Sequence, residues 1–199
     1  PEEFLDFQRL FGPLLERQPS ILIPGNHDTY TSRAWRTGRM EQLLAPFSGS
    51  GPWPRVYKTR EGLAVVSLDS CRAHLLSSGH IPSSQLRRLE ALLASESLAH
   101  HKLLVMLHYP LRDRRGERYG PASRALNNAR ALEEVLLKHS QRVVAILHGH
   151  EHHGFRSQLR EGEASIPIYN PGAGGYASLP EKGRKAHFNL YTWRRGALR

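Results

Sequence analysis

Apolar side chains recur at helical spacing along the first part of the chain. From Pro1 to Arg17 the spacing predicts an amphipathic helix, with Pro1 suited to its first turn. An isoleucine-rich run from Ser20 to Pro24 is typical of a buried strand, and Gly25 ends it. Helical spacing returns from Ser32 to Leu44, before a loop rich in Pro, Gly and Ser. This part of the chain is therefore expected to alternate helix, strand and helix.

The same alternation continues through the middle of the chain. Two strands, at 55–59 and 63–69, are expected to form a hairpin that turns at Glu61-Gly62. Further helices are predicted at 83–97 and 123–139, and further buried strands at 102–107 and 142–147. From His153 onward only short strand-like stretches follow. This order predicts a single layered α/β domain over residues 1–199, without an internal repeat or linker.

The bulk composition narrows the class of protein. With 199 residues, of which 39% are hydrophobic and 23% charged, the chain fits one globular domain and not a disordered segment. Its apolar runs are too short to cross a bilayer, so we expect no membrane span. A single cysteine, Cys71, excludes an internal disulfide framework and suits a reducing compartment. A cytoplasmic location is therefore the expectation.

The chain is strongly basic. Its 28 Lys and Arg outnumber 18 Asp and Glu, which gives a formal net charge of +10. Such a surface attracts nucleic acid, anionic lipid or phosphorylated substrates. Two alternatives remain, because the arginines are scattered as on a solvated surface and acidic residues could precede Pro1. No basic stripe interleaved with aromatic residues is present, so a phosphorylated small molecule is favoured as the partner, with nucleic acid as the alternative.

Three of the predicted buried strands run directly into segments that contain histidine. These segments are Gly25-Asn26-His27-Asp28, His108-Tyr109-Pro110 and Gly149-His150-Glu151-His152. In open α/β sheets, ligands bind just beyond the carboxyl ends of the strands, where the loops are held rigidly. Singly, His108 could be a structural residue and the first segment a simple turn. The occurrence of all three at strand ends predicts a metal site.

These segments, in this order and spacing, resemble the last three of the five motifs of the calcineurin-like metallophosphoesterases. The strand end Leu68-Asp69-Ser70 and the Gly79 turn also resemble the bacterial cyclic-nucleotide phosphodiesterase-like branch of that family. Asn170-Pro171-Gly172 resembles a late turn common in the family, and the resemblance extends from Ser20 to about Leu190. It implies an α/β fold with a layered β-sandwich flanked by helices. It also implies a metal-dependent hydrolase of phosphoesters, with phosphodiesters as the expected substrates.

The resemblance implies a set of metal ligands. In that family two divalent cations share a water or hydroxide, which acts as the nucleophile. Carried over to this sequence, Asn26, His108 and His150 would bind one cation and His152 would help to bind the other. Imidazole nitrogens and an amide oxygen suit manganese, iron or zinc. Two such cations would acidify water and neutralise charge on the phosphoryl transition state.

Four further residues are expected to face the substrate. By resemblance, His27 would protonate the leaving oxygen, and Asp28 would orient it. Tyr109 stands where many relatives have histidine, and it could line the substrate pocket or simply pack. Arg112 begins a run of arginines that could reach an anionic substrate, although a solvated charged loop is the alternative.

Two motifs of the family are not present in this sequence. The Asp-x-His and Gly-Asp motifs, whose carboxylates bind and bridge the metals, are expected upstream of Pro1, together with the first strands of the fold. One metal position therefore keeps three candidate ligands, and the other keeps only His152. A non-catalytic binding module on the same fold is thus an alternative to the hydrolase. A nuclease would share the chemistry and show salt-sensitive binding to nucleic acid.

Overall fold

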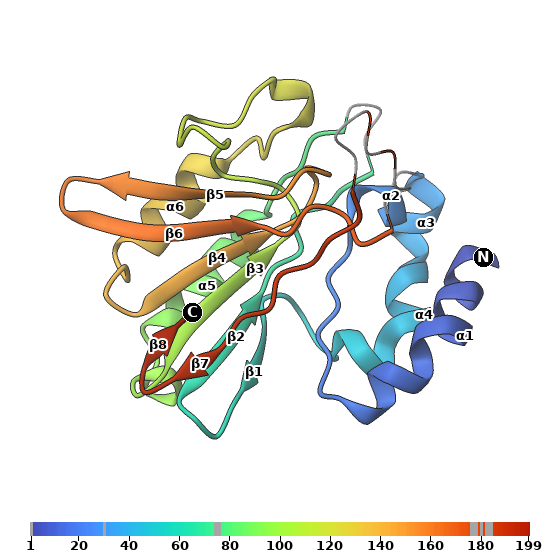
Figure 1. Cartoon of the computed structure of the whole chain (residues 1–199), viewed down its shortest axis with the longest axis horizontal. Helices are drawn as coiled ribbons and strands as arrows, with labels where there is room; N and C mark the ends of the chain where they lie inside the picture. The colour runs from blue at the N-terminus through green and yellow to red at the C-terminus, as the bar shows by residue number, and fades with distance from the viewer. Residues whose placement is uncertain (1, 30, 74–76, 176–178, 180, 182–184) are drawn as a thin grey trace.

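The computed structural model describes residues 2–29, 31–73, 77–175, 179, 181 and 185–199 (Figure 1). Its centre is a six-stranded sheet in the order β1-β2-β3-β4-β6-β5. The strands β2, β3, β4 and β6 run parallel, and β1 and β5 pair antiparallel at the two edges. The strand bounds are β1 Arg55–Lys58, β2 Leu63–Ser67, β3 Lys102–Leu107, β4 Val143–His148, β5 Phe155–Glu161 and β6 Ala164–Asn170.

Helices and a small second sheet flank the central one. Helices α5 and α6 pack on one face of the sheet, the hairpin β7–β8 lies on the other, and α1 to α4 gather beside the β1 edge (Figure 1). This layered α/β architecture is the one expected from the alternating pattern. The remaining bounds are α1 Glu2–Arg17, α2 Asn26–Thr29, α3 Ser32–Thr37, α4 Arg39–Ser48, α5 Ser83–Leu93, η1 Glu96–Leu98, η2 Ala122–Arg124, α6 Ala129–Leu137, β7 Trp193–Arg194 and β8 Ala197–Leu198.

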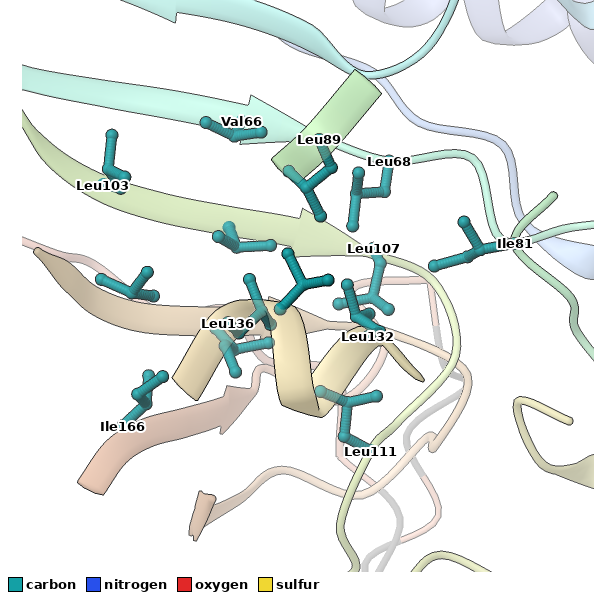
Figure 2. Packing of buried hydrophobic residues seen from close by; sticks show 14 of the residues in the cluster. Val66, Leu68, Ile81, Leu89, Leu103, Leu107, Leu111, Leu132, Leu136 and Ile166 are labelled. Carbon is teal, nitrogen blue, oxygen red and sulfur yellow. The ribbon is translucent and has the colours of Figure 1, made fainter. Parts of the chain in front are cut away.

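Alternation along the strands divides the apolar side chains between the two faces. Leu103, Val105 and Leu107 of β3 join the main core under α5 and α6, whereas Leu104 joins a smaller cluster against Trp193. Figure 2 shows the main core, in which side chains such as Leu107 are fully buried. Each such leucine stabilises the fold by about 1.5–3 kcal/mol through burial. The core therefore holds rigidly the strand ends at which the candidate site begins.

The strand predicted from Ser20 to Pro24 is wrong. Residues 19–25 form an irregular segment, held by a hydrogen bond from the Leu22 amide to the Phe47 carbonyl (3.3 Å) and by one from Cys71 Sγ to the Pro24 carbonyl (3.2 Å). A strand needs the backbone groups of a neighbouring strand, and β1 is the sheet edge on this side. Local apolar character cannot report whether that neighbour is present.

Two predicted helices are shorter than expected. The segment 32–44 is two helices, α3 and α4, which are separated at Gly38 with φ 55°. A left-handed residue breaks the helical ladder, and glycine adopts that conformation without steric cost. The segment 123–139 begins its helix only at Ala129, after a 3-10 turn. In the part of the chain that the structure describes, no helix combines the length and apolar character needed to span a membrane.

Candidate metal centre

The sheet topology brings two of the predicted histidine segments together. Strands β3 and β4 are parallel neighbours, and Leu107 pairs with His148 in register. Their carboxyl ends therefore release His108 and the Gly149-His150 segment at the same sheet edge. The Gly149 amide donates a hydrogen bond to the His108 carbonyl at 3.1 Å, which ties the two segments together.

Two glycines allow the third segment to approach His108. A Cβ atom on Gly25 would lie 3.2 Å from Cε1 of the His108 ring, and one on Gly149 would lie 3.2 Å from its Nδ1. Both positions are tighter than ordinary side-chain contacts, so a larger residue at either one would displace the ring. The segment around Asn26 forms the short helix α2, not the loop expected.

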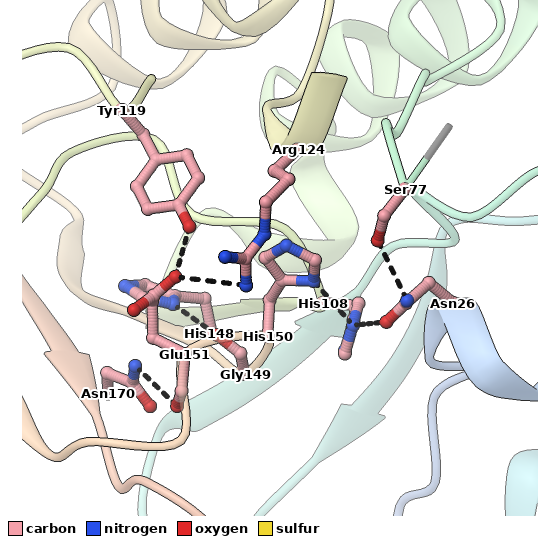
Figure 3. Close-up of polar contacts among 10 residues, drawn as sticks. All are labelled: Asn26, Ser77, His108, Tyr119, Arg124, His148, Gly149, His150, Glu151 and Asn170. Carbon is pink, nitrogen blue, oxygen red and sulfur yellow. Dashed lines mark hydrogen bonds and ion pairs between the residues drawn. The ribbon is translucent and has the colours of Figure 1, made fainter. Parts of the chain in front are cut away.

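Asn26, His108 and His150 converge through their side chains (Figure 3). The Oδ1 atom of Asn26 lies 2.7 Å from Nε2 of His108, and Nδ1 of His150 lies 3.3 Å from the same atom. The amide nitrogen of Asn26 donates to Ser77 Oγ at 3.0 Å, which turns the amide oxygen toward His108. One oxygen and two ring nitrogens thus meet at one point.

The electrostatic surroundings keep these histidines neutral. Burial is the main cause that lowers the pKa of His108 to about 3, and the neighbouring His150 and His148 lower it further. Burial also lowers the pKa of His150 to about 4, with Arg124 as the next cause. Both rings therefore carry lone pairs at neutral pH, as metal ligands must.

The backbone of His150 is unusual. Its φ of 68° is left-handed, a conformation that non-glycine residues adopt mostly at constrained sites. Its Nε2 is buried and has no hydrogen-bond partner among the described residues. A buried ring nitrogen without a partner is costly, and a ligand offsets that cost.

This donor set fits a divalent transition metal. Neutral imidazole nitrogens and an amide oxygen are ligands that manganese, iron and zinc accept. In the described part of the chain, no group of three or more His, Cys, Asp or Glu side chains is arranged to hold a metal. The convergent set therefore supplies only part of a coordination sphere, which needs about four to six ligands in all.

The remaining predicted ligand and the two predicted catalytic residues lie around this set. His152 is exposed and lies near enough for its charge to lower the pKa values of His108 and His150. His27 is exposed beside Asn26 on α2. The Asp28 carboxylate accepts a hydrogen bond from the Gly25 amide at 2.8 Å, so it anchors the turn that carries Asn26 and His27. Burial raises the Asp28 pKa, while that hydrogen bond and His27 lower it.

The two predicted substrate residues have partners inside the domain. Tyr109 is 1% exposed, and its ring lies 4.6 Å from that of His150, so it packs beneath the cluster. Arg112 forms an ion pair with the buried Glu133, with Nη1–Oε1 at 2.8 Å and Nη2–Oε2 at 3.0 Å. Packing for Tyr109 and an internal ion pair for Arg112 are the roles that these contacts support.

Residues that the sequence pattern did not single out support the His150 segment. Tyr119 donates a hydrogen bond to the Glu151 carboxylate, and Arg124 lies 3.8 Å from it (Figure 3). Asn170, noted only for its turn, donates from Nδ2 to the Glu151 carbonyl at 3.0 Å. Thirty-two positions separate Tyr119 from Glu151, so no local pattern could have revealed their contact.

Comparison with known proteins agrees with this geometry. The solved structure of a Staphylococcus aureus protein assigned as a 5′-nucleotidase, in complex with α-ketoglutarate, is similar in fold, with a TM-score of 0.52 at 13% sequence identity. The match covers 83% of this chain and 34% of that one, so this chain spans about a third of that protein's length. No curated protein matches the sequence. The profile described as calcineurin-like phosphoesterase matches residues 1–154, and this chain belongs to that family.

Proposed function

We propose that this chain forms the metal-binding and catalytic part of a metal-dependent phosphoester hydrolase that acts on phosphodiesters. The observation that supports this most directly is the convergence of Asn26 Oδ1 and His150 Nδ1 on His108 Nε2. Packing alone does not require three polar ligands to meet in a buried position at the carboxyl ends of two parallel strands. Membership of a family of phosphoesterases gives that position its chemistry.

Within this proposal the side chains have distinct tasks. Asn26, His108 and His150 hold one divalent cation, and the exposed His152 contributes to a second, both being manganese, iron or zinc. When bound, such cations draw charge from the phosphoryl oxygens and acidify water. Tyr119 and Asn170 keep the His150–His152 segment in place through Glu151.

His27 is the proposed general acid. It is exposed on α2 directly after Asn26, so its ring stands beside the cluster and in contact with solvent. An imidazole in this position can deliver a proton to the oxygen that leaves as the phosphoester bond breaks. The hydrogen bond from Gly25 to Asp28 fixes the turn on which His27 stands.

A non-catalytic binding module on the same fold is the alternative. It would share the sheet and the packed core but would not require neutral histidines to converge. The pKa values of His108 and His150, lowered to about 3 and about 4, favour the metal-binding interpretation over a purely structural one.

The test uses the whole protein loaded with Mn²⁺. Cleavage of bis-p-nitrophenyl phosphate is compared with cleavage of an alkyl phosphodiester in the parent protein and in His27→Gln. The variant should keep its metal content and lose about 10²–10⁴-fold in kcat on the alkyl ester, but less on the aryl ester, whose leaving group needs no proton. Exposed His100 provides the control, as His100→Gln should behave like the parent.

Two results would overturn the proposal. Metal-loaded parent protein that leaves diesters and monoesters intact would exclude the hydrolase and favour the binding module. An equal loss of kcat on aryl and alkyl esters in His27→Gln would exclude His27 as the general acid.

A further inference from the structure

A pocket of about 810 Å³ lies between the loop after β3 and the edge strand β5. Its lining contains six arginines: Arg112, Arg114, Arg115, Arg118, Arg156 and Arg160. The lining residues that the structure describes include one carboxylate, Glu117, and no aromatic ring. None of the candidate metal ligands lines it, so the pocket is distinct from the metal centre.

The loop that forms one wall is internally ordered. The Asp113 carboxylate accepts hydrogen bonds from the backbone amides of Arg115 (2.8 Å) and Glu117 (3.0 Å). Gly116, with φ 84°, donates from its amide to the Asp113 carbonyl at 3.1 Å. A backbone bridge between Arg112 and Arg118 closes the base of the turn. The arginines are therefore carried on a fixed turn, which lowers the entropy lost when a ligand binds.

Strand β5 forms the opposite wall. Arg156, Gln158 and Arg160 occupy alternate positions, so they share one face of the strand. The hydroxyl of Ser157 also lines the pocket, and it is buried without a hydrogen-bond partner among the described residues. A hydroxyl in that state can donate to a bound anion.

The positive charge of the pocket is largely uncompensated. Arg112 is paired with Glu133, which lies outside the pocket lining. The other five arginines take part in none of the ion pairs found among the described residues. Guanidinium groups crowded together repel one another, and a multivalent anion would remove that repulsion while forming bidentate hydrogen bonds.

We propose that this arginine pocket binds a compact anion with two or more phosphate groups. A single phosphate is too small to engage arginines from both walls of a pocket this size. Single-stranded nucleic acid is disfavoured, because such sites stack bases on aromatic side chains and this lining has none. The site is independent of the proposed hydrolysis, since it involves other residues and requires no metal.

Calorimetric titration of metal-free protein with inorganic tripolyphosphate tests the site. EDTA is kept in the buffer so that the probe cannot bind through a cation at the metal centre. Binding should weaken at least about tenfold in the double variant Arg114→Gln/Arg118→Gln, because two charge-assisted contacts are lost. The double variant Arg87→Gln/Arg194→Gln removes the same charge at exposed positions elsewhere and should bind like the parent.

Three further titrations complete the design. Orthophosphate should bind at least about tenfold more weakly than tripolyphosphate, and His108→Gln should leave tripolyphosphate binding unchanged. Equal weakening in both double variants would show general surface electrostatics and overturn the proposal. So would tighter binding of a twelve-nucleotide oligothymidylate than of tripolyphosphate, which would instead identify a nucleic-acid surface. Loss of hydrolysis without loss of tripolyphosphate binding would contradict only the proposed function.

Discussion

The side-chain oxygen of Asn26 lies 2.7 Å from Nε2 of His108, although 82 positions separate the two residues (Figure 3). The contact is possible because Gly25 and Gly149 leave room for the His108 ring on two sides. It joins helix α2 to the end of strand β3 and forms the centre of the candidate metal site. Four predictions follow from this site and the groups that surround the core.

Replacing His108 with glutamine should weaken binding of Mn²⁺ by at least about tenfold. The substitution removes the ring nitrogen on which Asn26 and His150 converge. Equilibrium dialysis with metal analysis measures the affinity. His100→Gln, on an exposed residue, is the control. Unchanged affinity in His108→Gln would remove this residue from the ligand set.

Tyr119→Phe should weaken metal binding by about tenfold while the fold stays intact. The variant loses the hydrogen bond to Glu151, so the segment from His150 to His152 is held less firmly. Burial raises the Tyr119 pKa and so does Glu151, which means that the hydroxyl keeps the proton it donates. Tyr57→Phe, on an exposed strand residue, should bind metal like the parent. Equal affinities in all three proteins would show that Glu151 needs no such support.

Glu133→Gln should destabilise the fold by about 3–5 kcal/mol, because it leaves the Arg112 guanidinium buried without its countercharge. Only 6% of the Glu133 side chain and 13% of the Arg112 side chain are exposed. Urea unfolding measures the change. The neighbouring Glu134→Gln should cost no more than about 0.5 kcal/mol, since Glu134 pairs with Arg130 at the surface.

The double variant Arg112→Met/Glu133→Leu provides the second comparison. It should recover most of the stability lost in Glu133→Gln, because neither buried position then carries a charge. If Glu133→Gln were as stable as the parent protein, the ion pair would have no structural role, and Arg112 would be available to a ligand.

The stability of the protein should depend on pH through Asp69. Burial raises the pKa of this carboxyl to about 6, against the lowering effect of the Cys71 amide hydrogen bond. Glu41 raises the pKa further and Arg55 lowers it. Between the ordinary value of about 3.9 and a pH of about 6, the folded state binds more protons than the unfolded state. The free energy of unfolding therefore decreases across this range as the pH rises.

Asp69→Asn isolates this contribution. The amide can still accept the Cys71 hydrogen bond, but it does not titrate. Relative to the variant, the parent protein should lose up to about 3 kcal/mol of stability between pH 4 and pH 7. Urea unfolding at unit pH steps gives the difference, and Asp6→Asn on exposed α1 should give a curve parallel to that of the parent. Parallel curves for Asp69→Asn would show that Asp69 titrates alike in both states.

Much of the fold could be predicted from local pattern. The apolar runs at 102–107 and 142–147 and the hairpin at 55–69 are strands in the structure because strand burial and turn chemistry are local properties. The candidate ligands could be selected by motif, because Asn26, His108 and His150 lie in short recognisable segments. Their roles in binding metal remain predictions.

The sequence by itself determined the layered α/β order and the residues that could carry the chemistry. The tertiary structure decided which segments have neighbours. It left Ser20 to Pro24 unpaired, placed Tyr119 on Glu151, gave Arg112 the buried partner Glu133, and formed the arginine pocket from a loop and an edge strand. Each of these contacts joins residues far apart in the chain. Their energy depends on burial and distance in space, which no local spacing of side chains encodes.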